Sequence, residues 1–166
     1  MEAVMTSDRR LTIVSACLSG APCRYDGRSR PDRGVMDAVA SGQALPLCAE
    51  VLGGLPTPRP AAEIVGGDGY DVLDGRARVV SVDGDDLTAA FIAGAKAVAD
   101  AAVEYGAHHA ILQARSPSCG CGSIYDGTHS GTLQAGDGVV AAELRRRGIR
   151  VEERSGRKPT DVGGNT

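Results

Sequence analysis

The sequence has few aromatic residues, with no Trp and a single Phe among its 166 residues. Its core must therefore be built mainly from Ala, Val, Leu and Ile. Hydrophobic residues make up 42% of the chain and charged residues 23%, proportions that exclude a disordered or fibrous protein. The formal net charge of −3 provides no basic field for nucleic acid. The length is that of one domain with a substantial buried core.

No secretory signal is recognisable, because residues 1–10 are polar and charged and the apolar run at 11–16 is too short for a signal core. No stretch approaches the apolar length of a membrane span. We therefore expect a cytoplasmic protein with no membrane partner. Five cysteines are an odd number for a disulfide framework, so metal binding or catalysis is the better interpretation.

Short apolar runs alternate with helical patterns along the chain. Strands are expected at residues 11–15, 44–47, 107–113 and 149–151, and helices at residues 32–40, 87–105 and 139–147. This alternation predicts an α/β fold, a single layered domain with a mostly parallel, Rossmann-like sheet. The expected domain covers residues 11–152, between flexible segments at 1–10 and 153–166.

Two details of this fold are predicted from local patterns. Asp74-Gly75 lies between residues 70–73 and 76–80, which favours a small inserted hairpin with a two-residue turn. In the long helix, the apolar spacing predicts a buried stripe of Ile92, Ala95, Ala99, Ala102 and Val103, with Gly106 just beyond the helix end.

Three cysteines lie beyond the carboxyl ends of predicted strands: Cys17, Cys48 and Cys119. In an open α/β sheet these ends line one edge, where ligands bind in a crevice, so we expect the three thiols to converge. Convergent thiolates suit zinc, copper(I) or an iron–sulfur cluster. The chain has none of the paired Cys-x-x-Cys knuckles of zinc fingers, and single cysteines in Gly-rich loops suit a larger cluster better. For any one cysteine alone, a small buried hydrophobe is the simpler interpretation.

Four motifs, in order, carry a family resemblance. They are Cys17-Leu-Ser-Gly-Ala-Pro-Cys-Arg-Tyr-Asp-Gly27, Cys48-Ala-Glu50 followed by Gly53-Gly-Leu-Pro-Thr-Pro-Arg59, Ser116-Pro-Ser-Cys-Gly120, and Tyr125-Asp-Gly-Thr128. Together they resemble the motifs of the bacterial thiouracil desulfidase (TudS-like) family, over nearly the whole chain. The resemblance implies an oxygen-sensitive [4Fe-4S] cluster held by Cys17, Cys48 and Cys119. The fourth iron, without a protein ligand, would remove sulfur from thiolated uracil and release it as hydrogen sulfide.

The same resemblance implies that Glu50 and Ser116 are catalytic side chains beside the open iron. Glu50 would deprotonate a water that attacks the ring carbon bearing the sulfur, and Ser116 would orient this water or relay a proton. From the residues alone, Glu50 fits a helix cap or a partner of Arg59 equally well, and Ser116 fits a turn residue. The expected partner is a small thiolated pyrimidine, 2- or 4-thiouracil or a nucleoside, rather than a nucleic acid.

A substrate-binding patch is a further candidate site, formed by Arg24, Tyr25 and Asp26. The alternative is that Arg24 and Asp26 form an ion pair that fixes their loop. His129 stands where relatives usually have an aromatic residue. It is a candidate for touching the substrate and carrying a proton near neutral pH, with a surface role as the alternative.

The remaining cysteines leave a second class of function open. Cys121 follows Cys119 by two residues and is a candidate spare ligand or resolving thiol. A non-catalytic zinc- or sulfide-binding module, or a redox sensor that uses Cys23 and Cys121, is therefore the alternative to an enzyme. Iron and labile-sulfide content would separate the two.

Overall fold

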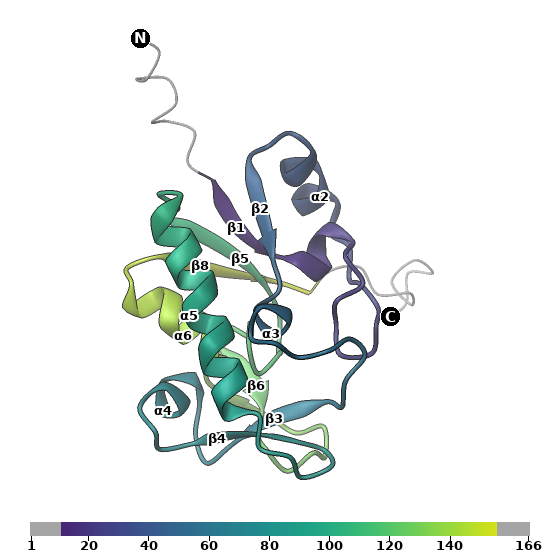
Figure 1. Cartoon of the computed structure of the whole chain (residues 1–166), viewed down its shortest axis with the longest axis vertical. Coiled ribbons are helices and arrows are strands. Elements are labelled where there is room, and N and C mark those ends of the chain that lie inside the picture. The colour runs from purple at the N-terminus through teal and green to yellow at the C-terminus, as the bar shows by residue number, and fades with distance from the viewer. Residues whose placement is uncertain (1–10, 156–166) are drawn as a thin grey trace.

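A four-stranded parallel sheet forms the centre of the molecule. The computed structural model describes residues 11–155, so the expected flexible segment at 1–10 and most of that at 153–166 lie outside the described residues. The strands are β1 (Thr12–Ser15), β2 (Ala44–Leu47), β5 (His109–Gln113) and β8 (Arg150–Arg154), in the spatial order β2-β1-β5-β8. Every neighbouring pair is parallel, which confirms the predicted α/β class (Figure 1).

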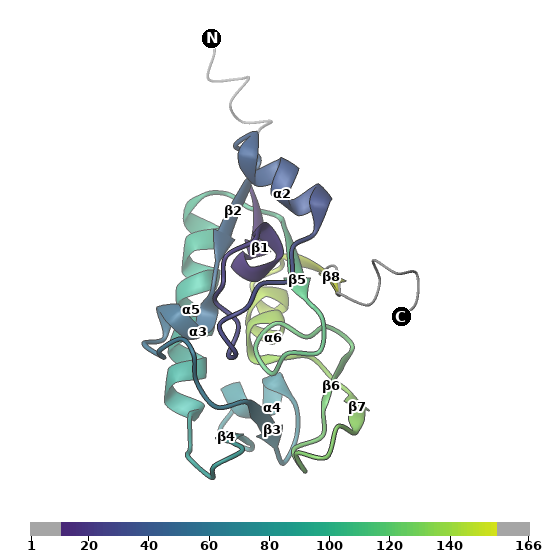
Figure 2. The same ribbon diagram turned by 90° about the vertical axis from the view of Figure 1, so that its right-hand side faces the viewer.

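Helices cover both faces of this sheet, because successive side chains of a strand point to opposite sides. Ile13 belongs to the larger core, which packs against α5 (Thr88–Glu104) and α6 (Val139–Arg146). Val14 belongs to a smaller core under α2 (Arg33–Ala40) and the 3-10 turn η1 (Ala16–Ser19). Figure 2 shows α2 on one side of the strands and α5 and α6 on the other.

A second group of short elements packs beyond the carboxyl edge of the central sheet. It contains α3 (Ala49–Leu52), α4 (Gly69–Leu73), the antiparallel pair β3 (Ala62–Val65) and β4 (Arg78–Ser81), and the antiparallel pair β6 (Ser123–Tyr125) and β7 (Leu133–Ala135). The helix α4 and the two strand pairs form the lower part of the molecule in Figures 1 and 2, and α3 lies above them beside α5.

Small antiparallel strand pairs are present, as β3–β4 and β6–β7, but the hairpin expected over residues 70–80 is not one of them. Its first arm is α4, which begins at a capping box: the Asp68 carboxylate accepts the N–H of Asp71, and the Asp71 carboxylate accepts that of Asp68. Gly75, with φ of +82°, turns the chain after this helix, because a left-handed glycine suits a helix end as well as a tight turn. The second arm is β4, which pairs with β3, a strand that the sequence patterns did not predict.

The long helix α5 confirms the expected helix over residues 87–105, and Gly106 follows it with φ of +68°. Its buried face differs in part from the expected stripe, since Val103 is 58% exposed and Phe91, Gly94 and Val98 are buried instead. At the other end of the chain, β8 continues to Arg154, so the first residues of the expected C-terminal segment belong to the sheet. No helix within residues 11–155 is both long and apolar enough to cross a membrane.

Two glycines allow α3 to pack closely on α5. A Cβ on Gly94 of α5 would overlap the carbonyl oxygen of Ala49, and a Cβ on Gly53, just after α3, would overlap that of Ala90. The absence of both side chains therefore lets the two backbones touch. This contact sets the position of the segment that carries Cys48 and Glu50.

Candidate functional site

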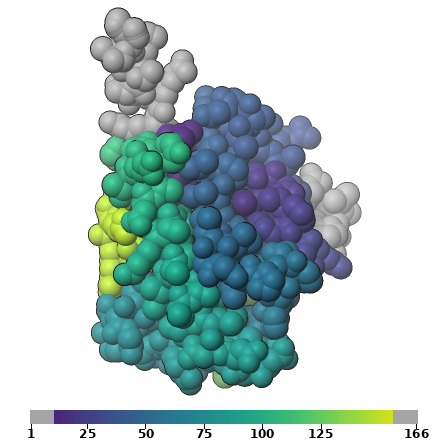
Figure 3. Space-filling view, in the orientation of Figure 1, coloured from purple at the N-terminus to yellow at the C-terminus, as the bar shows by residue number. Residues whose placement is uncertain are grey.

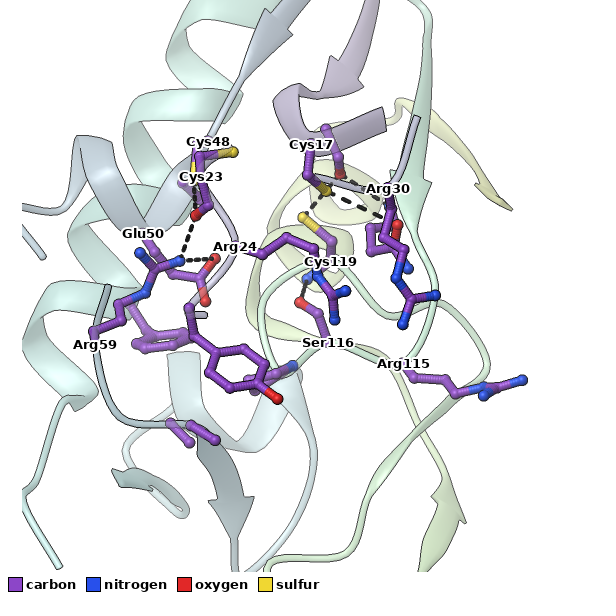
Figure 4. A pocket seen from close by; sticks show the side chains of 18 of the residues that line it. Cys17, Cys23, Arg24, Arg30, Cys48, Glu50, Arg59, Arg115, Ser116 and Cys119 are labelled. Atoms are coloured by element: carbon purple, nitrogen blue, oxygen red, sulfur yellow. Dashed lines mark hydrogen bonds and ion pairs between the residues drawn. The ribbon is translucent and has the colours of Figure 1, made fainter. Parts of the chain in front are cut away.

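A cavity of about 340 Å³ opens at the carboxyl edge of the central sheet, within the usual size range of small-molecule sites. Cys17 lies in η1, two residues beyond the end of β1, Cys48 directly follows β2, and Cys119 lies in the loop after β5; all three line this cavity. Figure 4 shows their side chains around the opening. Because β2, β1 and β5 are neighbours, the three strand ends meet as the sequence predicted. That these thiols bind a metal stays a prediction.

Each of the three thiols has a different polar neighbour. The Ser15 hydroxyl donates to Cys119 Sγ at 3.1 Å. The Cys17 thiol donates to Gln113 Oε1 at 3.9 Å, and the Cys48 thiol donates to the Cys23 carbonyl oxygen at 3.8 Å. Within residues 11–155, no three Cys, His, Asp or Glu side chains lie close enough together to hold a single metal ion. The thiols of Cys17, Cys48 and Cys119 therefore line the cavity without converging on a position for a single metal ion.

The surroundings of Cys119, Cys48 and Cys23 favour their protonated forms. Burial raises the pKa of buried thiols. It raises the pKa of Cys119 to about 12, against the opposing effect of the Ser15 hydroxyl. The interaction with the Cys23 thiol, followed by burial, raises the pKa of Cys48 well above its usual range. The Cys17 thiol, as a hydrogen-bond partner, raises the pKa of Cys23 to about 11, while Cys48 opposes this shift. Metal ligation would therefore have to release protons from this site.

The two remaining cysteines lie in different surroundings. Cys23 lines the cavity with the three predicted ligands. Cys121 does not line it; its sulfur instead accepts a hydrogen bond from Arg145 Nη2 at 2.8 Å. The structure thus does not bring Cys121 to the proposed ligands as a spare thiol, nor does it place Cys23 and Cys121 in one site.

Glu50 lies in the first turn of α3 and lines the cavity. Its Oε1 atom is 3.5 Å from Nη2 of Arg59, whose side chain is only 3% exposed. Arg59 also donates to the carbonyl oxygens of Pro56 and Cys23 and to the Thr57 hydroxyl, at 2.9–3.0 Å. Burial raises the pKa of Glu50, and the Arg59 guanidinium opposes that rise. The pairing with Arg59 that the sequence allowed is present, and it leaves the carboxylate facing the cavity.

Ser116 forms the turn that the sequence allowed, and its catalytic role stays a prediction. Its Oγ atom accepts the N–H groups of Ser118 at 3.0 Å and of Cys119 at 2.7 Å, so it shapes the turn that carries Cys119. Both lone pairs of the hydroxyl oxygen are thereby used, which leaves its proton free to be donated. Ser116 lines the cavity, where it can act as a hydrogen-bond donor.

The predicted substrate-binding residues are only partly brought together. Arg24 and Tyr25 line the cavity, whereas Asp26 and His129 do not. The Asp26 carboxylate accepts the N–H of Arg28 at 3.0 Å, and no ion pair joins it to Arg24 among the described residues. His129 has φ of +58°, and its N–H donates to Glu63 Oε1 at 3.0 Å. His129 thus belongs to a loop fixed by Glu63, which itself lines the cavity.

The cavity also contains polar residues that the sequence analysis missed. Arg30 and Arg115 join Arg24 in its wall, and within residues 11–155 none of the three pairs with a carboxylate. Burial, followed by the charge of Arg24, lowers the pKa of Arg30. Ser15 and Gln113 are buried at the ends of β1 and β5. The one sequence signal that could have revealed Ser15 and Gln113 was the polar residue at the end of each apolar strand.

In Figure 3, the purple segment after β1 and the blue segment after β2 lie next to each other on the surface.

Three comparisons describe what the chain is similar to. A family model described as 2-thiouracil desulfurase matches residues 12–155. A Bacillus subtilis (strain 168) protein named uncharacterized protein YbbK is 44% identical over 141 residues, which cover 85% of this chain and 93% of that protein. The solved structure of the [4Fe-4S]-dependent thiouracil desulfidase TudS superposes with a TM-score of 0.77 at 43% identity, covering 87% of this chain and 91% of that one.

Proposed function

The chain belongs to the 2-thiouracil desulfurase family, and on that premise we propose that it is a [4Fe-4S]-dependent desulfidase of thiolated uracil. The reaction is a hydrolysis: the C=S bond of the substrate and one water give the C=O bond of uracil and hydrogen sulfide. No external electrons are needed, because the sulfur leaves at the oxidation level of sulfide. The observation that carries the proposal is the placement of Cys17, Cys48 and Cys119 around one cavity with Glu50.

The donor set of the cavity suits such a cofactor. Three thiols from neighbouring strand ends surround a space without meeting at a point, as the separated corners of a cluster require. The Ser15 hydroxyl already donates to Cys119 Sγ, a contact that becomes stronger when this sulfur is a thiolate. We assign Cys17, Cys48 and Cys119 as the ligands. When bound, the cofactor supplies an iron with an open position, a Lewis acid for the thiocarbonyl sulfur.

Two side chains of the cavity act on the attacking water. Glu50 accepts a proton from this water at a carboxylate oxygen, and the ion pair with Arg59 keeps that carboxylate in place. Ser116 donates the proton of its hydroxyl to the water or the substrate, since its oxygen is occupied by two backbone N–H groups. Glu50 is thus the base of the reaction and Ser116 is an orienting donor.

The substrate is a small thiolated pyrimidine, in agreement with the cavity of about 340 Å³. Arg24, Arg30 and Arg115 give the cavity wall a positive charge that favours anions, such as the hydrosulfide product or an acidic substituent of the substrate. The assay should therefore compare the free bases, the nucleosides and their monophosphates.

The test is anaerobic purification and cluster reconstitution, followed by incubation with 2-thiouracil and 4-thiouracil. We expect about four iron and four sulfide per chain, and the release of uracil and sulfide in equal amounts. A folded, cluster-loaded protein that forms neither product from any thiolated pyrimidine would reject the activity. One zinc per chain without labile sulfide, in a protein prepared without air, would favour the non-catalytic module instead.

A further inference from the structure

Ser15 is a buried polar residue to which the proposed reaction assigns no role. It is the last residue of β1 and is 4% exposed. Its hydroxyl oxygen accepts the backbone N–H of Gln113 on the neighbouring strand β5, at 2.9 Å. The same hydroxyl lies 3.1 Å from Cys119 Sγ. Ser15 thus joins the sheet to one of the proposed ligands.

The direction of the Ser15–Cys119 hydrogen bond follows from this pairing. A backbone N–H can only donate, so the Ser15 oxygen must be the acceptor of the bond from Gln113. The Ser15 hydroxyl has one proton, which it donates to Cys119 Sγ. A sulfur that receives a hydrogen bond is stabilised most as a thiolate. The contact is therefore arranged for the ligated form of Cys119.

A second buried hydroxyl belongs to Ser118, the residue before Cys119 in the chain. Ser118 is fully buried, and its Oγ atom has no hydrogen-bond partner among the described residues. A buried hydroxyl without a partner destabilises the fold, so such a group calls for a partner in the working protein. The proton of the Ser118 hydroxyl is thus free to be donated within the site.

The other two proposed ligands have the opposite kind of contact. The thiols of Cys17 and Cys48 both donate, to the Gln113 amide oxygen and the Cys23 carbonyl oxygen. These contacts disappear when the thiols lose their protons. Cys119 alone among the three receives a hydrogen bond from a hydroxyl within residues 11–155. The hydrogen bonds of the three thiols therefore differ in direction: Cys119 accepts one, whereas Cys17 and Cys48 each donate one.

We propose that Ser15 is a positioning residue for the cofactor, whose hydroxyl donates to the Cys119 thiolate, with Ser118 as a second donor. These hydrogen bonds reduce the charge that Cys119 gives to its iron. Because hydrogen bonds to the sulfurs help to set the reduction potential of an iron–sulfur cluster, they raise that potential. The inference rests on the proposed function and adds two residues to its cofactor site.

The test compares Ser15→Ala, Ser15→Thr and Ser118→Ala in the anaerobically reconstituted protein. Ser19→Ala is the matched control, since the Ser19 hydroxyl donates to the Ala16 carbonyl in the same segment and has no hydrogen bond to a thiol within residues 11–155. Iron and sulfide content, the reduction potential and the Fe–S(Cys) stretching frequencies are measured. We expect Ser15→Ala to keep its cluster with a more negative potential and a higher Fe–S(Cys) frequency. Ser118→Ala should shift both in the same direction, and Ser15→Thr should restore the wild-type values.

Several outcomes would overturn the inference. A fully loaded Ser15→Ala protein with the wild-type potential and frequencies would do so, as would a shift of the same size in Ser19→Ala. If the Ser15→Ala protein does not take up a cluster, the Ser118→Ala protein provides the test. An unchanged reduction potential and unchanged Fe–S(Cys) frequencies in Ser118→Ala would then contradict the proposal. A wild-type protein that takes up no cluster would instead reject the proposed function, so the two failures are distinguishable.

Discussion

The Arg59 guanidinium holds the Glu50 carboxylate beside Cys23: its Nη2 atom is 3.5 Å from Glu50 Oε1 and donates to the Cys23 carbonyl oxygen at 2.9 Å. The Cys48 thiol donates to that same carbonyl oxygen. One buried cation therefore links the proposed base to the loop that contacts a proposed ligand (Figure 4). Its removal should affect stability and turnover together.

Replacing Arg59 by Met should leave Glu50 without its partner. Breaking a buried ion pair costs about 3–5 kcal/mol, and because the Glu50 side chain is 18% exposed we expect about 2–3 kcal/mol here. Urea unfolding measures this loss. Arg76→Met is the control, because Arg76 is 63% exposed where it pairs with Asp71, so this substitution should change stability much less than Arg59→Met. Equal losses in the two variants would contradict the role given to Arg59.

Cys48→Ser and Ser116→Ala should separate cofactor binding from catalysis. The first variant removes a proposed ligand and should lose iron and labile sulfide. The second keeps the three thiols and should retain its cluster while sulfide release falls by about 100-fold or more. Cys121→Ser, which alters a thiol outside the cavity, should retain both. A cluster-free but active Cys48→Ser protein would show that the ligand assignment is wrong.

The contact between α3 and α5 should not tolerate a methyl group. Gly94→Ala places a Cβ against the Ala49 carbonyl oxygen, so α3 must move, at a cost of about 1–3 kcal/mol. Because α3 follows Cys48, cofactor content should fall as well. In Gly34→Ala, the new Cβ meets only side-chain atoms at 3.4 Å or more, and the helix α2 should gain up to about 1 kcal/mol. Thermal unfolding of the two variants provides the comparison, and an unchanged Gly94→Ala protein would contradict the packing argument.

Stability should fall at low pH through Asp74. A hydrogen bond from Arg146, aided by its charge, lowers the pKa of Asp74 to about 2. A carboxyl group with a depressed pKa stabilises the fold above its unfolded pKa, near 4. That contribution is lost as the pH falls from about 4 to about 2. Asp74→Asn should therefore be less stable than wild type at pH 7, with a difference that shrinks towards pH 2. A constant difference across this range in urea titrations would contradict the assignment.

The sequence predicted the central sheet and the convergence of three cysteines because both depend on strong local signals. Cys17 and Cys48 directly follow short apolar runs, and parallel strands place their ends on one edge. The short elements beyond the carboxyl edge of the central sheet, such as α4 and β3, were harder to predict. The Asp74-Gly75 pair suits a hairpin turn and a helix end alike, and the capping box at Asp68 and Asp71 decides for the helix. Local patterns do not rank such alternatives, because the partner strand β3 lies elsewhere in the chain.

The sequence predicted which thiols line the candidate site, but it revealed only some of the polar residues there. Ser15 and Arg115 have neighbours far away in sequence, so no motif spacing revealed them. For His129, the motif suggested the substrate cavity, whereas its backbone N–H is held by Glu63 from β3. An ionisable residue in a loop can face either way, and only the tertiary contacts decide which.

The order of the strands also determines when the cofactor can be inserted during synthesis. Under the proposed assignment, two of the thiols lie in the first third of the chain, while Cys119 follows a strand that must first dock beside β1. A nascent chain on the ribosome therefore exposes an incomplete set of donors until most of the domain has emerged. Loading should consequently be a late step, carried out on a nearly finished fold by whatever machinery delivers iron and sulfide.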